Sequence, residues 1–354
     1  MPRLKLHIDA VNQEIADFQD NVRRGLGVLR QIGEVRIGAT PRSLIFELEG
    51  VRLYRYGAAQ TGAGGTPLLI VYALVNRPEV TDLQADRSLI AALMARGFDV
   101  YLIDWGYPGG ADRMLGLDDY VTRYIDGCVD HLLARLQRPA LPLLGICQGG
   151  TLSVCYAALY PHKVERLITT VTPIDFHTAQ DMLSHLVRRI DVTRLVESCG
   201  NVSGDMLNGL FLSLKPYRLT QQKYLRFVEQ LGDASAVAMF LRMEQWIFDS
   251  PALAARACGE FARDFYQGNK LLTGELQLAG RGIDLRAVNM PVLNIYARDD
   301  HLVPPAAARA LRALVGTNDY TEVEVAGGHI GIYVGLESPG SVPVAVAQWM
   351  ARAS

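Results

Sequence analysis

The apolar and polar positions of this chain alternate between two patterns that predict strands and helices in turn. Short, largely apolar runs are typical of strands covered on both faces of a sheet. We predict strands at 67–74, 100–105, 142–146, 166–172, 291–297 and 321–326, after a hairpin at 42–56. We predict helices between and after them at 83–96, 117–137, 148–160, 305–314 and 342–353. Strands that alternate with helices in this way predict an α/β fold with a mostly parallel sheet and right-handed crossovers.

The pattern changes between residues 177 and 286, where it is mostly helical with scattered Gly and Pro. We predict one helix there through Met182, Leu186 and Ile190, which stand one turn apart, and others at 222–231 and 234–248. Because strand patterns resume afterwards, we interpret 177–286 as a helical cap, or lid. It would be inserted into an α/β core made of residues 1–176 and 287–354.

Residues 1–33 predict an amphipathic helix with a heptad rhythm. Apolar residues recur at alternating steps of three and four, with a break at Gly25, and they are Leu4, Ile8, Val11, Ile15, Phe18, Val22, Leu29 and Ile32. Two interpretations remain open. The helix lies on the protein's own core, or its apolar stripe is a seam for another helix of this chain or of a partner.

The strand at 142–146 runs directly into the helix at 148–160 through Gly145-Ile146-Cys147-Gln148-Gly149. This G-x-C-x-G segment follows the G-x-S-x-G pattern of the nucleophile elbow, the sharp strand-to-helix turn of the α/β-hydrolase fold. Gly145 and Gly149 would let the backbones pass closely, since glycine has no Cβ. A thiolate attacks acyl groups and also leaves well, so Cys147 suits acyl transfer. The alternative is a buried cysteine that only packs in a glycine-rich turn.

An acid and a histidine follow the elbow in the chain order that this fold requires. Asp300 comes after the strand at 291–297, with Asp299 as its competitor, and His329 comes after the strand at 321–326 between glycines. We expect His329 to take the proton of Cys147 and Asp300 to orient His329.

The oxyanion hole and a second cysteine complete the candidate chemistry. Backbone N–H groups of Gln148 and Val75 are expected to stabilise the oxyanion, because one follows the nucleophile and the other lies in the loop after the first long strand. Cys128 lies in the helix at 117–137 with no catalytic motif around it. We therefore interpret it as a packed thiol, with a second acyl carrier as the alternative.

Composition narrows the classes of protein that remain. The formal net charge of −2 gives no basic field that would favour nucleic acid. Five cysteines with irregular spacing and no C-x-x-C pair fit neither a disulfide framework nor a zinc site, so we expect a reducing cytoplasm and no metal. The N-terminus lacks the apolar run of a signal peptide, and no run of about 18 uncharged apolar residues predicts a transmembrane segment.

Taken together, the motifs resemble the catalytic subunits of class III polyhydroxyalkanoate synthases, which belong to the α/β-hydrolase superfamily. The resemblance runs through nearly the whole chain and is least clear in the cap, and the short length also suits class III. The motifs that carry it are Gly145-Ile146-Cys147-Gln148-Gly149-Gly150, Tyr72-Ala73-Leu74-Val75-Asn76-Arg77, Asp104-Trp105-Gly106, Asp300-His301-Leu302-Val303-Pro304 and Gly327-Gly328-His329-Ile330-Gly331-Ile332-Tyr333.

The resemblance implies polymerisation of (R)-3-hydroxyacyl-CoA, typically 3-hydroxybutyryl-CoA, into polyester with release of coenzyme A and without a cofactor. It implies that Cys147 carries the growing chain, that His329 activates the thiol, and that Asp300 assists deprotonation of the substrate 3-hydroxyl. It also implies a second, non-catalytic subunit of the PhaE type, a homo- or hetero-oligomer, and attachment to polymer granules in the cytoplasm. Class IV synthases, a cysteine esterase or thioesterase of the same fold, and a non-catalytic scaffold remain as alternatives.

Overall fold

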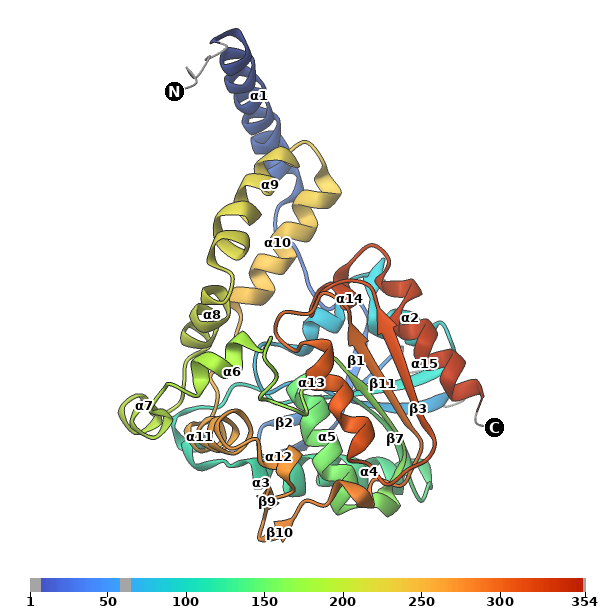
Figure 1. The fold of residues 1–354 in the computed structure, drawn as a ribbon. Helices are drawn as coiled ribbons and strands as arrows, with labels where there is room; N and C mark the ends of the chain where they lie inside the picture. The colour runs from blue at the N-terminus through green and yellow to red at the C-terminus, as the bar shows by residue number, and fades with distance from the viewer. Residues whose placement is uncertain (1–7, 58–64, 353–354) are drawn as a thin grey trace.

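The computed structural model describes residues 8–57 and 65–352, and within them the central element is an eight-stranded sheet (Figure 1). Its strand order is β1-β2-β6-β3-β7-β8-β11-β12. The pairs β1–β2 and β2–β6 are antiparallel, and every other neighbouring pair is parallel. The strands are β1 (Arg42–Leu48), β2 (Val51–Tyr56), β3 (Thr66–Val71), β6 (Phe98–Asp104), β7 (Leu141–Ile146), β8 (Val164–Thr170), β11 (Val292–Ala297) and β12 (Tyr320–Val325). The mostly parallel sheet predicted from the sequence is confirmed.

Helices cover both faces of the sheet, which explains the continuous apolar runs of its strands. Successive residues of a strand point to opposite faces, so Leu69 of β3 packs on one side and Ile70 on the other. One face is covered by α4 (Asp126–Leu136) and α5 (Gln148–Leu159), and the other by α2 (Leu89–Met94) and α15 (Val342–Ala351). The helix predicted at 117–137 is continuous, since α3 (Leu117–Asp119) and a π-helical turn (Tyr120–Ile125) lead into α4. For the helix predicted at 342–353, Ala353 lies outside the described residues.

The helix predicted at 83–96 is wrong in its first half. The chain there forms a small hairpin of β4 (Asp82–Gln84) and β5 (Arg87–Ser88), and only then the short helix α2. The hairpin is held by Asp82, whose carboxylate accepts hydrogen bonds from the Thr40 amide at 2.7 Å and the Ser88 hydroxyl at 2.6 Å. A contact with a residue 42 positions away decides the local structure, and the local pattern does not contain it.

Between 177 and 286 the chain is mostly helical. The elements are α6 (Met182–Val187), α7 (Val192–Cys199), α8 (Gly204–Ser213), a π-helical turn (Tyr217–Gln222), α9 (Lys223–Glu229), α10 (Ala234–Phe248), α11 (Ala255–Glu260), a π-helical turn (Phe261–Gln267), α12 (Lys270–Thr273) and the pair β9 (Gln277–Leu278) and β10 (Arg281–Gly282). The single helix predicted through Ile190 is wrong, because α6 ends at Val187. The Gln267 side chain donates to the carbonyls of Val187 and Ile190, at 3.2 and 3.0 Å, and so fixes a turn after the helix.

Two parts of the helical region, beyond α6 and α7, contact the sheet domain differently. We call residues 204–250, with α8, α9 and α10, the outer cap, and residues 251–286 the inner cap. Figure 1 shows the outer cap projecting away from the sheet. The inner cap contributes buried Phe261, Phe265 and Leu271 to the same apolar cluster as one face of the sheet.

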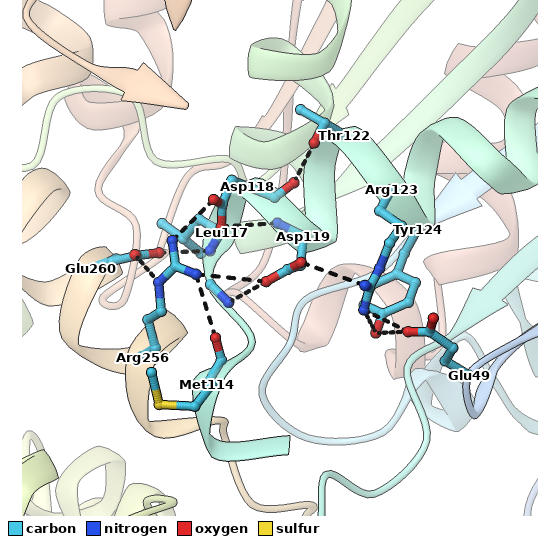
Figure 2. Close-up of polar contacts among 11 residues, drawn as sticks. Glu49, Met114, Leu117, Asp118, Asp119, Thr122, Arg123, Tyr124, Arg256 and Glu260 are labelled. Carbon is cyan, nitrogen blue, oxygen red and sulfur yellow. Dashed lines mark hydrogen bonds and ion pairs between the residues drawn. The ribbon is translucent and has the colours of Figure 1, made fainter. Parts of the chain in front are cut away.

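Polar contacts also attach the inner cap to the sheet domain, as Figure 2 shows. Arg256 of α11 bonds Glu260 of its own helix at 2.7 Å and reaches Asp118 of α3 at 2.9 Å. Glu260 in turn accepts a hydrogen bond from the Leu117 amide at 2.7 Å. The inner cap is thus joined to the N-terminus of a core helix as well as to the core.

The N-terminal helix α1 (Ile8–Ile32) contacts α9 and α10, and Figure 1 shows it extending beyond the far end of the outer cap. Gly25, where the heptad rhythm breaks, is the point of close approach: a Cβ there would lie 2.6 Å from Cβ of Leu231. Ile15 and Phe18 are exposed on the same helix. The helix therefore lies on the outer cap, with part of its apolar stripe uncovered; Leu4 lies outside the described residues.

The remaining helices connect or follow the last strands. They are α13 (Pro305–Arg309), which with the 3-10 turn Ala310–Ala313 occupies the predicted 305–314 segment, and the short α14 (Gly331–Val334). β11 and β12 are parallel neighbours, so the loops that follow them lie side by side at one edge of the sheet. That edge carries the candidate active site.

Candidate active site

Cys147 occupies the sharp turn between β7 and α5, in a backbone conformation rare for a residue with a side chain. Its φ is 54° and its ψ is −124°. The turn is held because the Cys147 amide donates to the Thr170 carbonyl of β8 at 3.0 Å. Strain of this kind persists only where the surroundings impose it, and it is concentrated at functional sites. The geometry is that of a nucleophile elbow.

The glycines on either side of Cys147 are required by close approach of three elements. A Cβ on Gly145 would lie 2.4 Å from Cα of Gly150, and one on Gly149 would lie 2.3 Å from the Val71 carbonyl oxygen. No side chain fits at such distances. The two glycines therefore allow α5 to begin directly against the ends of β7 and β3.

Asp300 and His329 come from the adjacent loops after β11 and β12 and contact each other. Nδ1 of His329 lies 2.7 Å from Oδ2 of Asp300, and both residues are buried. The other carboxylate oxygen, Oδ1, accepts hydrogen bonds from the amides of Leu302 and Val303 at 2.8 and 2.9 Å. When Nδ1 of His329 carries a proton, it donates a hydrogen bond to the Asp300 carboxylate, which leaves Nε2 for other chemistry. Asp299, the competitor, is exposed.

The pKa of His329 reflects both partners. Burial acts to lower this pKa, but the charges of Asp300 and Cys147, and hydrogen bonds with both, raise it well above 6.5. The imidazole is therefore stabilised in its protonated form beside the thiol.

The loop after β3 is connected to the elbow through the side chain of Gln148. The Leu74 amide donates to Oε1 of Gln148 at 3.0 Å, so it is not directed at a substrate. The next amide, that of Val75, makes no hydrogen bond within the described part of the chain. The Gln148 amide begins α5, where helix geometry leaves the N–H without an intrahelical partner. The sequence did not single out the Gln148 side chain, because its partner is 74 residues away.

Three tyrosines lie close enough to Cys147 for its charge to affect them. Burial is the main cause of the raised pKa values of Tyr72, Tyr266 and Tyr333, and the charge of Cys147 contributes to each. Tyr333 also pairs with the Thr170 hydroxyl at 2.6 Å. The site thus has neutral phenol groups near its thiol. No local pattern had identified Tyr266, which comes from the inner cap.

Three other cysteines are enclosed largely by apolar surroundings. Burial raises the pKa of Cys128 and of Cys155 to about 12, and that of Cys258 to about 11. Cys128 is fully enclosed by the core, as expected for a packed thiol. Among the described residues, no group of three or more His, Cys, Asp or Glu side chains is arranged to hold a metal ion. No helix in residues 8–57 and 65–352 combines the length and apolar character needed to cross a bilayer.

Comparison with known proteins agrees with the fold. Residues 66–336 match the family model described as alpha/beta hydrolase fold. A solved hydrolase from Pseudomonas aeruginosa PA01 superimposes with a TM-score of 0.54 over 88% of this chain and 99% of that one, at 16% identity. At this identity the match concerns the fold alone.

Two curated relatives are much more similar. The chain is 48% identical over 344 residues to the poly(3-hydroxyalkanoate) polymerase subunit PhaC of Allochromatium vinosum, covering 97% of each chain. It is 47% identical over 354 residues to the protein of the same name from Thiocystis violacea, covering 99% of each. The resemblance predicted from the motifs is confirmed at the level of the family. The chain belongs to the poly(3-hydroxyalkanoate) polymerase PhaC subunits, on an α/β-hydrolase fold.

Proposed function

We propose that this chain polymerises (R)-3-hydroxyacyl-CoA, typically 3-hydroxybutyryl-CoA, into polyester through a covalent thioester on Cys147, with release of coenzyme A. One observation carries the proposal. An elbow cysteine lies beside a buried His329–Asp300 pair, in a chain 48% identical to a named polymerase subunit over 97% of both. The class III type, with a separate partner subunit, is part of the proposal.

The first step transfers the acyl group to the enzyme. Nε2 of His329 takes the proton of Cys147, and the thiolate attacks the acyl carbonyl. When the tetrahedral intermediate collapses, the bond to the coenzyme A sulfur breaks and His329 returns the proton to that sulfur. Amides of Gln148 and Val75 stabilise the oxyanion. One thioester replaces another, so little driving force is lost.

The second step extends the chain. The 3-hydroxyl of a further substrate attacks the cysteinyl thioester, which is downhill: an oxoester bond forms, the bond to the Cys147 sulfur breaks, and the hydroxyl proton passes to that sulfur. The extended chain is then a coenzyme A thioester, and it returns to Cys147 by the first step with release of coenzyme A. His329 and Asp300 share the removal of the hydroxyl proton. A serine nucleophile would hold the chain as a less reactive ester, which is why a cysteine suits this work. All of the groups belong to the chain and its substrates, so the proposed reaction uses no cofactor or metal.

Residues 177–286 act as the cap in this proposal, on a core of residues 1–176 and 287–354. Water competes with the hydroxyl acceptor, so the cap would exclude it during the second step. It would also open for coenzyme A entry and for exit of the chain. Tyr266, supplied by this region near the thiol, supports its part in enclosing the site.

The test is incubation of the purified chain with (R)-3-hydroxybutyryl-CoA, alongside Cys147→Ala. Free coenzyme A is measured, and the acyl product is separated into insoluble polyester and soluble acid. Release that depends on Cys147 and yields polyester supports the proposal. Release that yields only 3-hydroxybutyric acid would support the thioesterase alternative. No release by the wild type, alone or with a PhaE-type subunit, would contradict both.

We also propose that α1 contributes to binding a second, non-catalytic subunit of the PhaE type in a hetero-oligomer. On α1, which projects from the outer cap, Ile15 is 51% exposed and Phe18 is 53% exposed. Leu225 of the neighbouring α9 is 57% exposed. These side chains supply an apolar stripe of the kind another helix covers. Co-purification with such a subunit should be lost in Phe18→Glu and kept in Asp20→Asn, an exposed polar position of the same helix. The site of action would be the granule surface in the cytoplasm.

A further inference from the structure

The loop after β3, residues 72–77, is held by side chains from two different parts of the molecule. We call it the oxyanion loop. From the core, Nε1 of Trp105 donates to the Tyr72 carbonyl at 3.0 Å, and the Gln148 side chain accepts from the Leu74 amide at 3.0 Å. From the outer cap, Nε1 of Trp246 donates to the Arg77 carbonyl at 2.6 Å. The first half of the loop thus rests on the core. The second half contacts the cap through the Arg77 carbonyl, and the Arg77 side chain also pairs with Asp104 of β6 at 2.7 Å.

Val75 and Asn76 lie between these two attachments. Asn76 has a φ of 58°, in the left-handed region that asparagine tolerates better than most residues. This conformation turns the chain just after Val75, whose amide is the candidate oxyanion donor. The direction of the Val75–Asn76 segment therefore depends on what keeps Asn76 in place.

The side chain that holds Asn76 comes from the cap. The hydroxyl of Ser250, two residues after the end of α10, donates to Oδ1 of Asn76 at 2.7 Å across 174 positions of sequence. The Ser250 hydroxyl has a second acceptor in reach, the Ile247 carbonyl at 2.8 Å, which also receives a hydrogen bond from Nδ2 of Asn208 at 2.6 Å. Of the two acceptors, Oδ1 of Asn76 is the nearer, and Asn208 competes for the Ile247 carbonyl alone.

Ser250 is itself fixed within the outer cap. Nδ2 of Asn208, a buried residue of α8, donates to the Ser250 hydroxyl oxygen at 3.0 Å. The start of α8 also passes so close that a Cβ on Gly204 would lie 2.1 Å from the Ser250 carbonyl oxygen. Because α8 and the end of α10 both define its position, Ser250 moves with the outer cap as a unit.

We propose that Ser250 is a positioning residue that completes the oxyanion hole from the cap. By holding Asn76 in its left-handed conformation it directs the Val75 amide toward the acyl oxygen, and it does so only when the outer cap is seated as in this structure. Displacement of the outer cap would remove this hydrogen bond and leave the acyl-transfer site incomplete. The inference rests on the proposed function, since it assigns the Val75 amide to the oxyanion of that reaction.

The test compares Ser250→Ala with Ser213→Ala. Ser213 is an exposed serine of α8 that bonds only within its own helix, to the Leu210 carbonyl. Coenzyme A release from (R)-3-hydroxybutyryl-CoA gives kcat and KM, and alkylation of Cys147 by iodoacetamide gives a rate that involves no oxyanion. We expect Ser250→Ala to lower kcat about ten- to a hundredfold, because loss of one oxyanion donor costs about 10²- to 10³-fold. KM and the alkylation rate should stay near those of Ser213→Ala, and Ser250→Thr should restore most of kcat.

A double variant distinguishes loss of this hydrogen bond from general destabilisation of the fold. Asn76→Gly removes the acceptor but tolerates positive φ without strain, so it should reproduce the kcat loss. Ser250→Ala combined with Asn76→Gly should lose little more than either alone, since both remove the same hydrogen bond. Equal kcat in Ser250→Ala and Ser213→Ala would overturn the inference while leaving the proposed function intact. So would equal losses of kcat, alkylation rate and thermal stability in Ser250→Ala. A wild type without Cys147-dependent release would instead overturn the proposed function, and this inference with it.

Discussion

The catalytic edge of the sheet and the outer cap hold their side chains in different ways. Three strands of one sheet lead directly to Cys147, Asp300 and His329. Asp300 and His329 are buried, and their side chains are hydrogen-bonded to each other. In the outer cap, α9 has no buried residue, and Tyr224, Leu225 and Phe248 are exposed. Few buried contacts make a region easier to displace. In the proposed function, the chemistry is therefore carried by the densely buried end of the sheet, and access to it is controlled by the outer cap.

The largest effect should come from the catalytic edge of the sheet. Asp300→Asn keeps the shape of the side chain but removes the charge that holds the Nδ1 proton of His329. We expect kcat for coenzyme A release to fall by about 10³-fold or more. Asp299→Asn, at the exposed neighbour, should leave kcat close to the wild type. Equal losses of kcat in the two variants would contradict the assignment of Asp300 as the residue that orients His329.

A second prediction compares the stability of the inner and outer cap. Phe265 of the inner cap is fully buried, whereas Phe248 at the end of α10 is 66% exposed. Phe265→Ala should lower the free energy of unfolding by about 3–5 kcal/mol. Phe248→Ala should change it by no more than about 0.5 kcal/mol. Urea unfolding followed by circular dichroism measures both, and a large loss in Phe248→Ala would contradict the description of the outer cap.

A third prediction concerns the contact that joins the two regions. Trp246→Phe keeps an aromatic ring but leaves the Arg77 carbonyl without the indole donor. An unsatisfied buried carbonyl costs about 1–3 kcal/mol. We expect this loss to appear mainly as faster amide hydrogen exchange in α10, with exchange in α5 unchanged. Equal acceleration in both helices would mean that the outer cap does not open separately.

The sequence predicted elements that depend on neighbouring residues better than elements that depend on distant contacts, for a physical reason. The elbow, its glycines and the loops after β11 and β12 are defined by neighbouring residues, so local motifs contain them. The hairpin in place of a helix at 83–88, and the end of α6 at Val187, depend on side chains far away in sequence. The bond from Ser250 to Asn76 is of the same kind, and no spacing rule could have identified it.

The last prediction is a change in pH dependence. Because the pKa of His329 is raised on folding, its protonated form adds stability that is complete below the unfolded value of about 6.5. That stability is lost as pH rises through the higher folded value. Asp300→Asn should therefore destabilise the protein more at pH 6 than at pH 9, as measured by urea unfolding at both. An equal difference at the two pH values would contradict the charge pairing, and Asp299→Asn serves as the control.

The most direct measurement is to locate the acyl group on the protein. The chain is mixed briefly with isotopically labelled (R)-3-hydroxybutyryl-CoA, quenched in acid, digested and analysed by mass spectrometry. We expect a labelled thioester on the peptide that contains Cys147, absent from Cys147→Ala. We expect no label on Cys128, because burial raises the pKa of its thiol to about 12. Label on Cys128, or on any residue in Cys147→Ala, would contradict the assignment of the nucleophile.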